Sequence, residues 1–127
     1  MSLSPPSPLQ HGLCAALCIA LVGSPLRAEH FHPVTSRSDF LAIVQGAQLT
    51  ALGVAFEVRP DGRLTGTAVS GRIRGTWTWT DGFFCRSGQL GERQMTPDCT
   101  TVEVLSQTLR LTARKGEGKS RDYWIRR

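Results

Sequence analysis

Five arginines recur through the middle of the chain, interleaved with threonines. A guanidinium group holds a carboxylate or phosphate through two parallel hydrogen bonds. Several such groups on one face of a sheet could therefore bind an anionic envelope polymer or an acidic protein. The expected anion-binding face consists of Arg59, Arg63, Arg72, Arg74 and Arg86. The alternative is a solvated sheet face with no partner, since charged faces are the ordinary surface of a domain.

Large aromatic side chains form the second candidate group. Small β-barrels sometimes hold one apolar ligand inside. The residues that could line such a pocket are Phe56, Trp77, Trp79 and Phe83. The alternative is that these side chains fill the core, because a small domain has few other large residues for that purpose.

Two histidines lie close together in the segment Glu29-His30-Phe31-His32. If an export signal is removed just before Glu29, the new amine and two imidazoles could hold copper, nickel or zinc loosely. A loose tail with incidental histidines is the alternative. We therefore assign no metal site and no cofactor.

Motifs for catalysis are missing from the sequence. It contains neither the G-x-S-x-G pattern of a serine nucleophile nor the H-E-x-x-H pattern of a zinc protease. We assign no catalytic residue and predict a protein that binds. Nucleic acid is a poor partner, because aromatic side chains for base stacking are not displayed among the arginines.

Length and charge limit the architecture. The 127 residues allow one domain, which excludes a TIM barrel and a full dinucleotide-binding fold. The chain has 15 Lys and Arg against 10 Asp and Glu, and 40% of its residues are hydrophobic, which suffices for a small core. We expect a monomer.

The N-terminal residues have the pattern of a secretory signal. The uncharged apolar run from Leu13 to Val22 is shorter than the roughly 20 residues that span a bilayer. Ala28 provides a small residue for cleavage before Glu29. An uncleaved anchor is the alternative. We predict a signal peptide over 1–28, a flexible segment over 29–35 and one domain over 36–127. The expected location is the periplasm or the exterior, with no transmembrane segment after cleavage.

Cys85 and Cys99 remain after removal of that signal. An even pair in a small exported chain predicts one disulfide. A metal site is the alternative, but two cysteines without a nearby histidine make a poor one.

A short helix is expected first, and strands after it. Ser36 can cap the helix with Asp39 three positions later, Phe40 and Val44 fall at helical spacing, and Gly46 can end it. Turn dipeptides then recur through the chain. We predict a mostly β domain, an antiparallel meander of about seven strands that forms a small open barrel or a sandwich.

Side-chain parity predicts the register of three hairpins, because a buried face needs apolar residues opposite one another. A three-residue loop over 60–62 places Val58 opposite Leu64. A two-residue loop at Ser70-Gly71 places Ala68 opposite Ile73 and Gly66 opposite Gly75.

The third hairpin has two possible registers. A three-residue loop over 80–82 places Trp79 opposite Phe83 and Trp77 opposite Cys85, and the other register would bury Arg86. We therefore predict that Cys85 points inward in a largely buried bridge, and that Arg86 points outward.

Three segments carry a resemblance to a known family: DGRLTG at 61–66, GTWTWTDGFFCR at 75–86, and Asp98-Cys99. They resemble a family of small exported bacterial proteins that share the pattern G-x-W-x-W-x-D-G-x-F-C-R followed by D-C. Some members carry the name dihydrodipicolinate reductase, so the resemblance implies a possible reductase. The chain lacks the glycine-rich strand-to-helix turn that holds a nicotinamide cofactor. A structural envelope component is the third alternative.

Overall fold

The computed structural model describes residues 2–4 and 29–127. The apolar run Leu13–Val22 and the predicted cleavage residue Ala28 lie outside the described residues. Among those described, no helix is both long enough and apolar enough to cross a bilayer.

Strands make up most of the described chain, with one short helix near the start. The elements are β1 (His32–Val34), α1 (Arg37–Val44), β2 (Gln48–Ala51), β3 (Val54–Val58), β4 (Arg63–Ala68), β5 (Gly71–Thr80), β6 (Phe83–Leu90), β7 (Arg93–Leu105), β8 (Thr108–Thr112), the 3-10 helix η1 (Arg114–Gly116) and β9 (Ser120–Arg126). The prediction of a mostly β fold with one N-terminal helix is confirmed.

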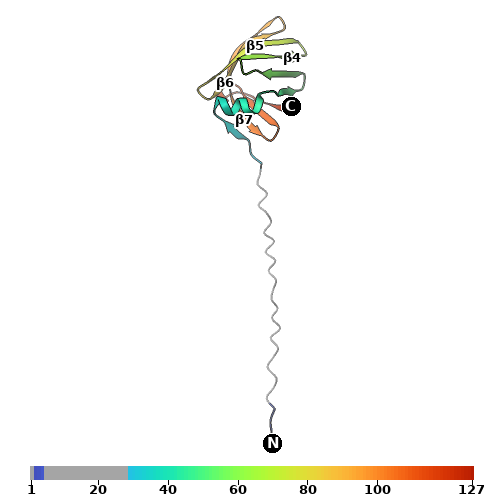
Figure 1. The fold of residues 1–127 in the computed structure, drawn as a ribbon, viewed down its shortest axis with the longest axis vertical. Coiled ribbons are helices and arrows are strands. Elements are labelled where there is room, and N and C mark those ends of the chain that lie inside the picture. The colour runs from blue at the N-terminus through green and yellow to red at the C-terminus, as the bar shows by residue number, and fades with distance from the viewer. Residues whose placement is uncertain (1, 5–28) are drawn as a thin grey trace.

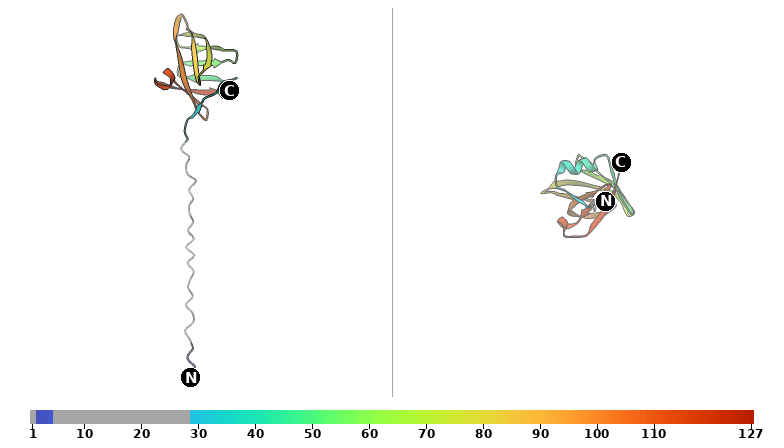
Figure 2. Two further views of the ribbon diagram at one scale, coloured as in Figure 1. Left: turned by 90° about the vertical axis from the view of Figure 1, so that its left-hand side faces the viewer. Right: turned by 90° about the horizontal axis from the view of Figure 1, so that it is seen from below.

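The strands β2 to β9 form a closed antiparallel barrel. Each pairs with the next along the chain, and β9 returns to pair with β2, with Leu49 opposite Ile125. The views in Figure 2 show the strands curving round into this ring. The barrel is therefore closed rather than open, and the strand count in the described residues exceeds the expected seven by two.

The extra strand is β1, which pairs with the second half of β7 through Val34 opposite Val102 and His32 opposite Val104. Phe31, just before it, lies 3.8 Å from the guanidinium of Arg110. Residues 32–34 therefore belong to the sheet, whereas the sequence predicted a flexible segment over 29–35. The strand formed because an edge of β7 lies free beyond the end of β6.

The helix forms as predicted from its local signals. The Ser36 side chain accepts a hydrogen bond from the Asp39 backbone N–H at 3.1 Å, which caps the first turn. Phe40 and Val44 are fully buried, and Gly46 adopts φ +71° just beyond the helix end.

Helix α1 closes one end of the barrel with Phe40. The ring centroid of Phe40 lies 5.0 Å from those of Trp79 and Phe84 and 5.7 Å from that of Trp77. In Figure 1 the helix lies low on the barrel and the turn between β6 and β7 lies at the top. The aromatic cluster is thus the core of the closed end.

Two hairpin registers differ in outcome. The 60–62 loop is confirmed, with Val58 opposite Leu64 and Gly62 at φ +90°. The next hairpin is shifted by two residues, because its turn is Val69-Ser70 and Ala68 lies opposite Gly71. Position 71, the first residue of β5, needs glycine, because a Cβ there would lie 2.8 Å from the Gly91 Cα atom. The shift preserves the faces, but Gly66 lies opposite Ile73, not Gly75.

Candidate functional site at the barrel mouth

The hairpin between β5 and β6 decides which side chains enter the barrel. Its turn has two residues, Asp81 at φ 53° and Gly82 at φ 83°, so Trp77 lies opposite Arg86. Asp-Gly favours this turn because both positions need positive φ. The predicted register was therefore wrong, and Arg86 shares the inward face with Trp77.

A cavity of about 600 Å³ opens at the end of the barrel opposite α1. This barrel mouth is ringed by the turns that follow β2, β4 and β6. Its walls are mainly apolar and include Val54, Phe56, Leu64, Ile73, Phe84, Leu90, Met95 and Leu111. The volume lies in the ordinary range for small-molecule pockets.

The charges in this cavity are all positive. Arg86, Arg93 and Arg121 line it, and no aspartate or glutamate does. Among the described residues, no carboxylate lies within ion-pair distance of any of the three. Arg86 is half-buried against these apolar walls, and burial of a charge is costly unless an anion compensates it, so the cavity favours a negative group.

Arg86 is the most enclosed of these cations. It is half-buried, and its Nη1 lies 3.9 Å from the Sδ atom of Met95, which is only a weak acceptor. Asp98 lies opposite Arg86 on β7, but its carboxylate accepts the backbone N–H of Arg114 at 3.1 Å. The guanidinium of Arg86 is therefore free to bind another acceptor.

Tyr123 and Arg121 form the far wall of the cavity on β9. The Tyr123 ring packs edge-on against the Phe56 ring, with 5.2 Å between their centroids. The Arg121 guanidinium lies 5.5 Å from the centroid of the Tyr123 ring. Burial raises the pKa of the Tyr123 hydroxyl above its ordinary value, and the charges of Arg121 and Arg86 offset part of this rise. At neutral pH the phenol is protonated and can donate to an anion.

Tyr123 is the only tyrosine in the chain, so its titration should show directly how the charges of Arg86 and Arg121 affect its pKa. We expect its tyrosinate absorbance to appear above the pH typical of a free phenol, and Arg86→Gln to move the midpoint higher still, because it removes a favourable charge. With the folded pKa raised, the phenol's contribution to stability is present below the unfolded pKa and is lost as pH rises through the folded pKa. An unchanged midpoint in Arg86→Gln would contradict the position of Arg86 near Tyr123 inside the barrel. The control is Arg72→Gln, which should leave the midpoint unchanged.

Of the four predicted aromatic residues, only Phe56 lines the barrel mouth. Trp77 is in the closed end, where its Nε1 donates to the Arg59 carbonyl at 2.7 Å, and Trp79 packs on Phe40. Phe83 was predicted inward. It lies opposite Thr80 on the outer face, with the Lys115 nitrogen 5.5 Å from its ring, because the two-residue turn reverses its parity.

The predicted arginine face is divided by the structure. Arg86 is inside the barrel, whereas Arg72 and Arg74 are exposed on the outer face of β5. Arg63 pairs with Asp61 at 2.8 Å and Arg59 lies 3.9 Å from Glu57. Anion binding by the outer arginines stays a prediction.

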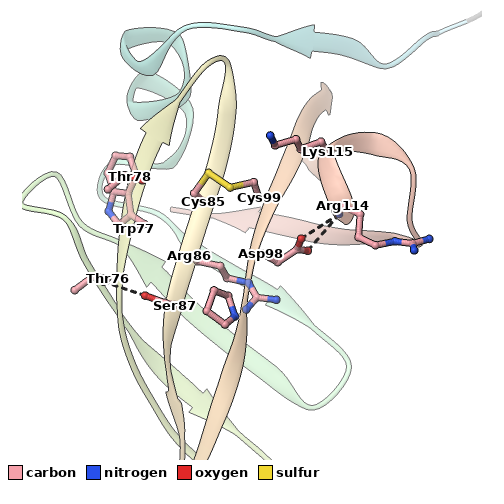
Figure 3. A pocket seen from close by; sticks show the side chains of 11 residues that line it. Thr76, Trp77, Thr78, Cys85, Arg86, Ser87, Asp98, Cys99, Arg114 and Lys115 are labelled. Atoms are coloured by element: carbon pink, nitrogen blue, oxygen red, sulfur yellow. Dashed lines mark hydrogen bonds between the residues drawn. A yellow bond between two sulfur atoms is a disulfide. The ribbon is translucent and has the colours of Figure 1, made fainter.

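The disulfide Cys85–Cys99 joins directly opposed residues of β6 and β7. Cys85 lies opposite exposed Thr78, so the bridge is half-buried on the outer face, not inside as predicted. Figure 3 shows it in an outer groove with Asp98, Arg114 and Lys115 beside it. Arg86 also borders this groove, beside a bulge in β7.

Sequence reasoning missed Arg121 and Arg93 as cavity residues. Arg121 lies two positions before Tyr123 on β9, so the two side chains share the inward face. Arg93 follows the two-residue turn after Leu90. Which face Arg93 occupies depends on the length of that turn, which the sequence analysis did not predict. In the described part of the chain, no group of three metal-binding side chains occurs, so His30 and His32 have no third side chain placed beside them as a metal ligand.

No protein-family model, curated protein or solved structure matches this chain. The resemblance to the exported bacterial family therefore stays a prediction that rests on its motif residues.

Proposed function

We propose that this protein is a non-catalytic binding module of the cell envelope, periplasmic or secreted, whose barrel holds an amphiphile with an apolar chain and an anionic head. The observation that carries the proposal is the cavity of about 600 Å³ with apolar walls, three arginines and no carboxylate. The disulfide supports an oxidising compartment. We also propose that the chain belongs to the family of small exported proteins that share its motif.

The polarity of the cavity suggests how the ligand lies. Phe84, Leu64 and Ile73 are buried and line its inner wall, where an apolar chain loses contact with water. Arg121 is exposed and lies nearer the rim, whereas Arg86 and Tyr123 are half-buried. The anionic head would lie between Arg86, Arg121 and the Tyr123 hydroxyl, with the chain against the apolar walls.

The proposal is tested by calorimetric titration with a matched ligand pair, dodecanoate and dodecanol. These share a chain and differ in charge, so we expect dodecanoate to bind more tightly. Arg86→Gln should weaken dodecanoate by about tenfold to a hundredfold, since a hydrogen bond to a charged group contributes roughly 1.5–3 kcal/mol. Dodecanol should be little affected.

The matched control is Arg72→Gln, which removes the same charge from the outer face of β5. It should leave the affinity for dodecanoate unchanged. Equal affinity for the two ligands, or equal losses in the two variants, would refute an anionic head inside the barrel. Absence of binding by both ligands would refute the proposal as a whole.

The reductase implied by some family names has less support. A pyrophosphate site needs a glycine-rich loop before a helix. The residues before α1 are Thr35 and Ser36, and the repeated glycines of β4 and β5 are in hairpins.

A further inference from the structure

The rim of the barrel mouth carries two exposed apolar side chains. Leu52 in the turn after β2 is 98% exposed, and Val69 in the turn after β4 is 91% exposed. The Val69 backbone N–H donates to the Gly53 carbonyl at 3.1 Å, so the two turns are held together. Exposed apolar side chains on two adjoining turns, bordered by polar residues, are typical of an interaction surface.

Cations accompany these side chains. The Arg121 Nη2 donates to the Leu52 carbonyl at 3.2 Å, which fixes a positive charge beside the apolar tip. Arg93 is exposed at the base of the third turn, whose Glu92 is the one carboxylate in the three rim turns. Apolar tips on a rim that also carries Arg93 and Arg121 suit the interface of a bilayer with anionic lipids, where apolar groups insert and arginines meet head groups.

We propose that the rim formed by Leu52, Val69, Arg93 and Arg121 docks on the surface of an anionic lipid bilayer. Charge complementarity selects this partner over a neutral membrane. The cavity opens at the same rim, so an amphiphile could pass between the bilayer and the barrel with little exposure of its chain to water. Docking itself needs no ligand in the cavity, and it can be tested separately from ligand binding.

The test is flotation of the purified protein with vesicles of phosphatidylglycerol and phosphatidylcholine or of phosphatidylcholine alone. We expect binding to the anionic vesicles that weakens as salt rises. The double variant Leu52→Ser, Val69→Ser should lose at least about tenfold in vesicle affinity. Its thermal midpoint should be close to that of the wild type, since both side chains are exposed in the folded state.

Two matched variants make the result specific. Trp124→Ser removes the other exposed large apolar side chain of the barrel, 58% exposed on β9 near the 106–107 turn at the closed end, and it should bind vesicles like the wild type. Arg86→Gln should bind dodecanoate about tenfold to a hundredfold more weakly but keep vesicle binding. Equal vesicle binding by the wild type and the rim double variant would overturn the proposal. Equal binding to both kinds of vesicle would overturn the selection by charge, and binding to neither would overturn the proposal and favour a protein partner for the rim. Retained dodecanoate affinity in that case would leave the cavity function standing.

Discussion

Replacement of Phe40 by alanine is expected to lower the free energy of unfolding by about 3–5 kcal/mol. Phe40 has no exposed surface, and its ring packs against Trp77, Trp79 and Phe84 with centroid distances of 5.0 to 5.7 Å. The variant leaves a cavity at the closed end that the rigid strands cannot fill. Urea unfolding followed by tryptophan fluorescence measures the loss, because two of the indoles contact Phe40.

The matched control for this experiment is Phe83→Ala. It deletes the same ring from the outer face, where Phe83 is half-buried beside Lys115. Its effect on the free energy of unfolding should be much smaller. Equal losses in the two variants would contradict the register that places Phe84 inside and Phe83 outside.

Replacement of both Cys85 and Cys99 by serine should remove about 3 kcal/mol of stability, because it frees a loop of roughly 15 residues in the unfolded chain. The bridge spans a sequence separation of 14 and lies on the outer face. Binding of dodecanoate should therefore persist at temperatures where the variant is folded.

The wild type treated with a reductant provides the control for the disulfide. It should unfold at the same urea concentration as the double serine variant, and native unreduced protein should show no free thiol at these positions. Stoichiometric labelling of both cysteines, or no change on reduction, would show that the bridge is absent.

Local signals predicted the features that local physics controls. Ser36 and Asp39 fix the start of the helix, and Pro60-Asp61-Gly62 fixes its hairpin, because the deciding contacts lie within a few residues. Ring closure between β2 and β9 and the pairing of β1 with β7 join residues far apart in sequence. No turn residue carries that information, so the sequence led only to about seven strands in an open barrel or a sandwich.

The candidate site was missed for a related reason. The register of the β5–β6 hairpin was chosen to keep Arg86 out of a dry core. That assumption fails because the barrel is packed at one end by Phe40 and Trp77 and is open at the other, where a guanidinium has room. A sequence shows which side chains share a face, but not how much space that face encloses.

Closure of the ring by the final strand also sets the order in which the barrel can assemble. The hairpins from β3 to β7 join near neighbours and can form early, but β2 stays unpaired on one side until β9 arrives. Contacts between such distant segments form slowly. During that interval β2 and β8 each present a free edge, which is a template for pairing with another chain. We therefore expect the nascent chain to be most prone to aggregation just before β9 docks. The same step brings Arg127 to the carbonyls of Ala42 and Ile43 at the end of α1. Docking of β9 therefore completes the barrel and at the same time fixes the helix that closes its end.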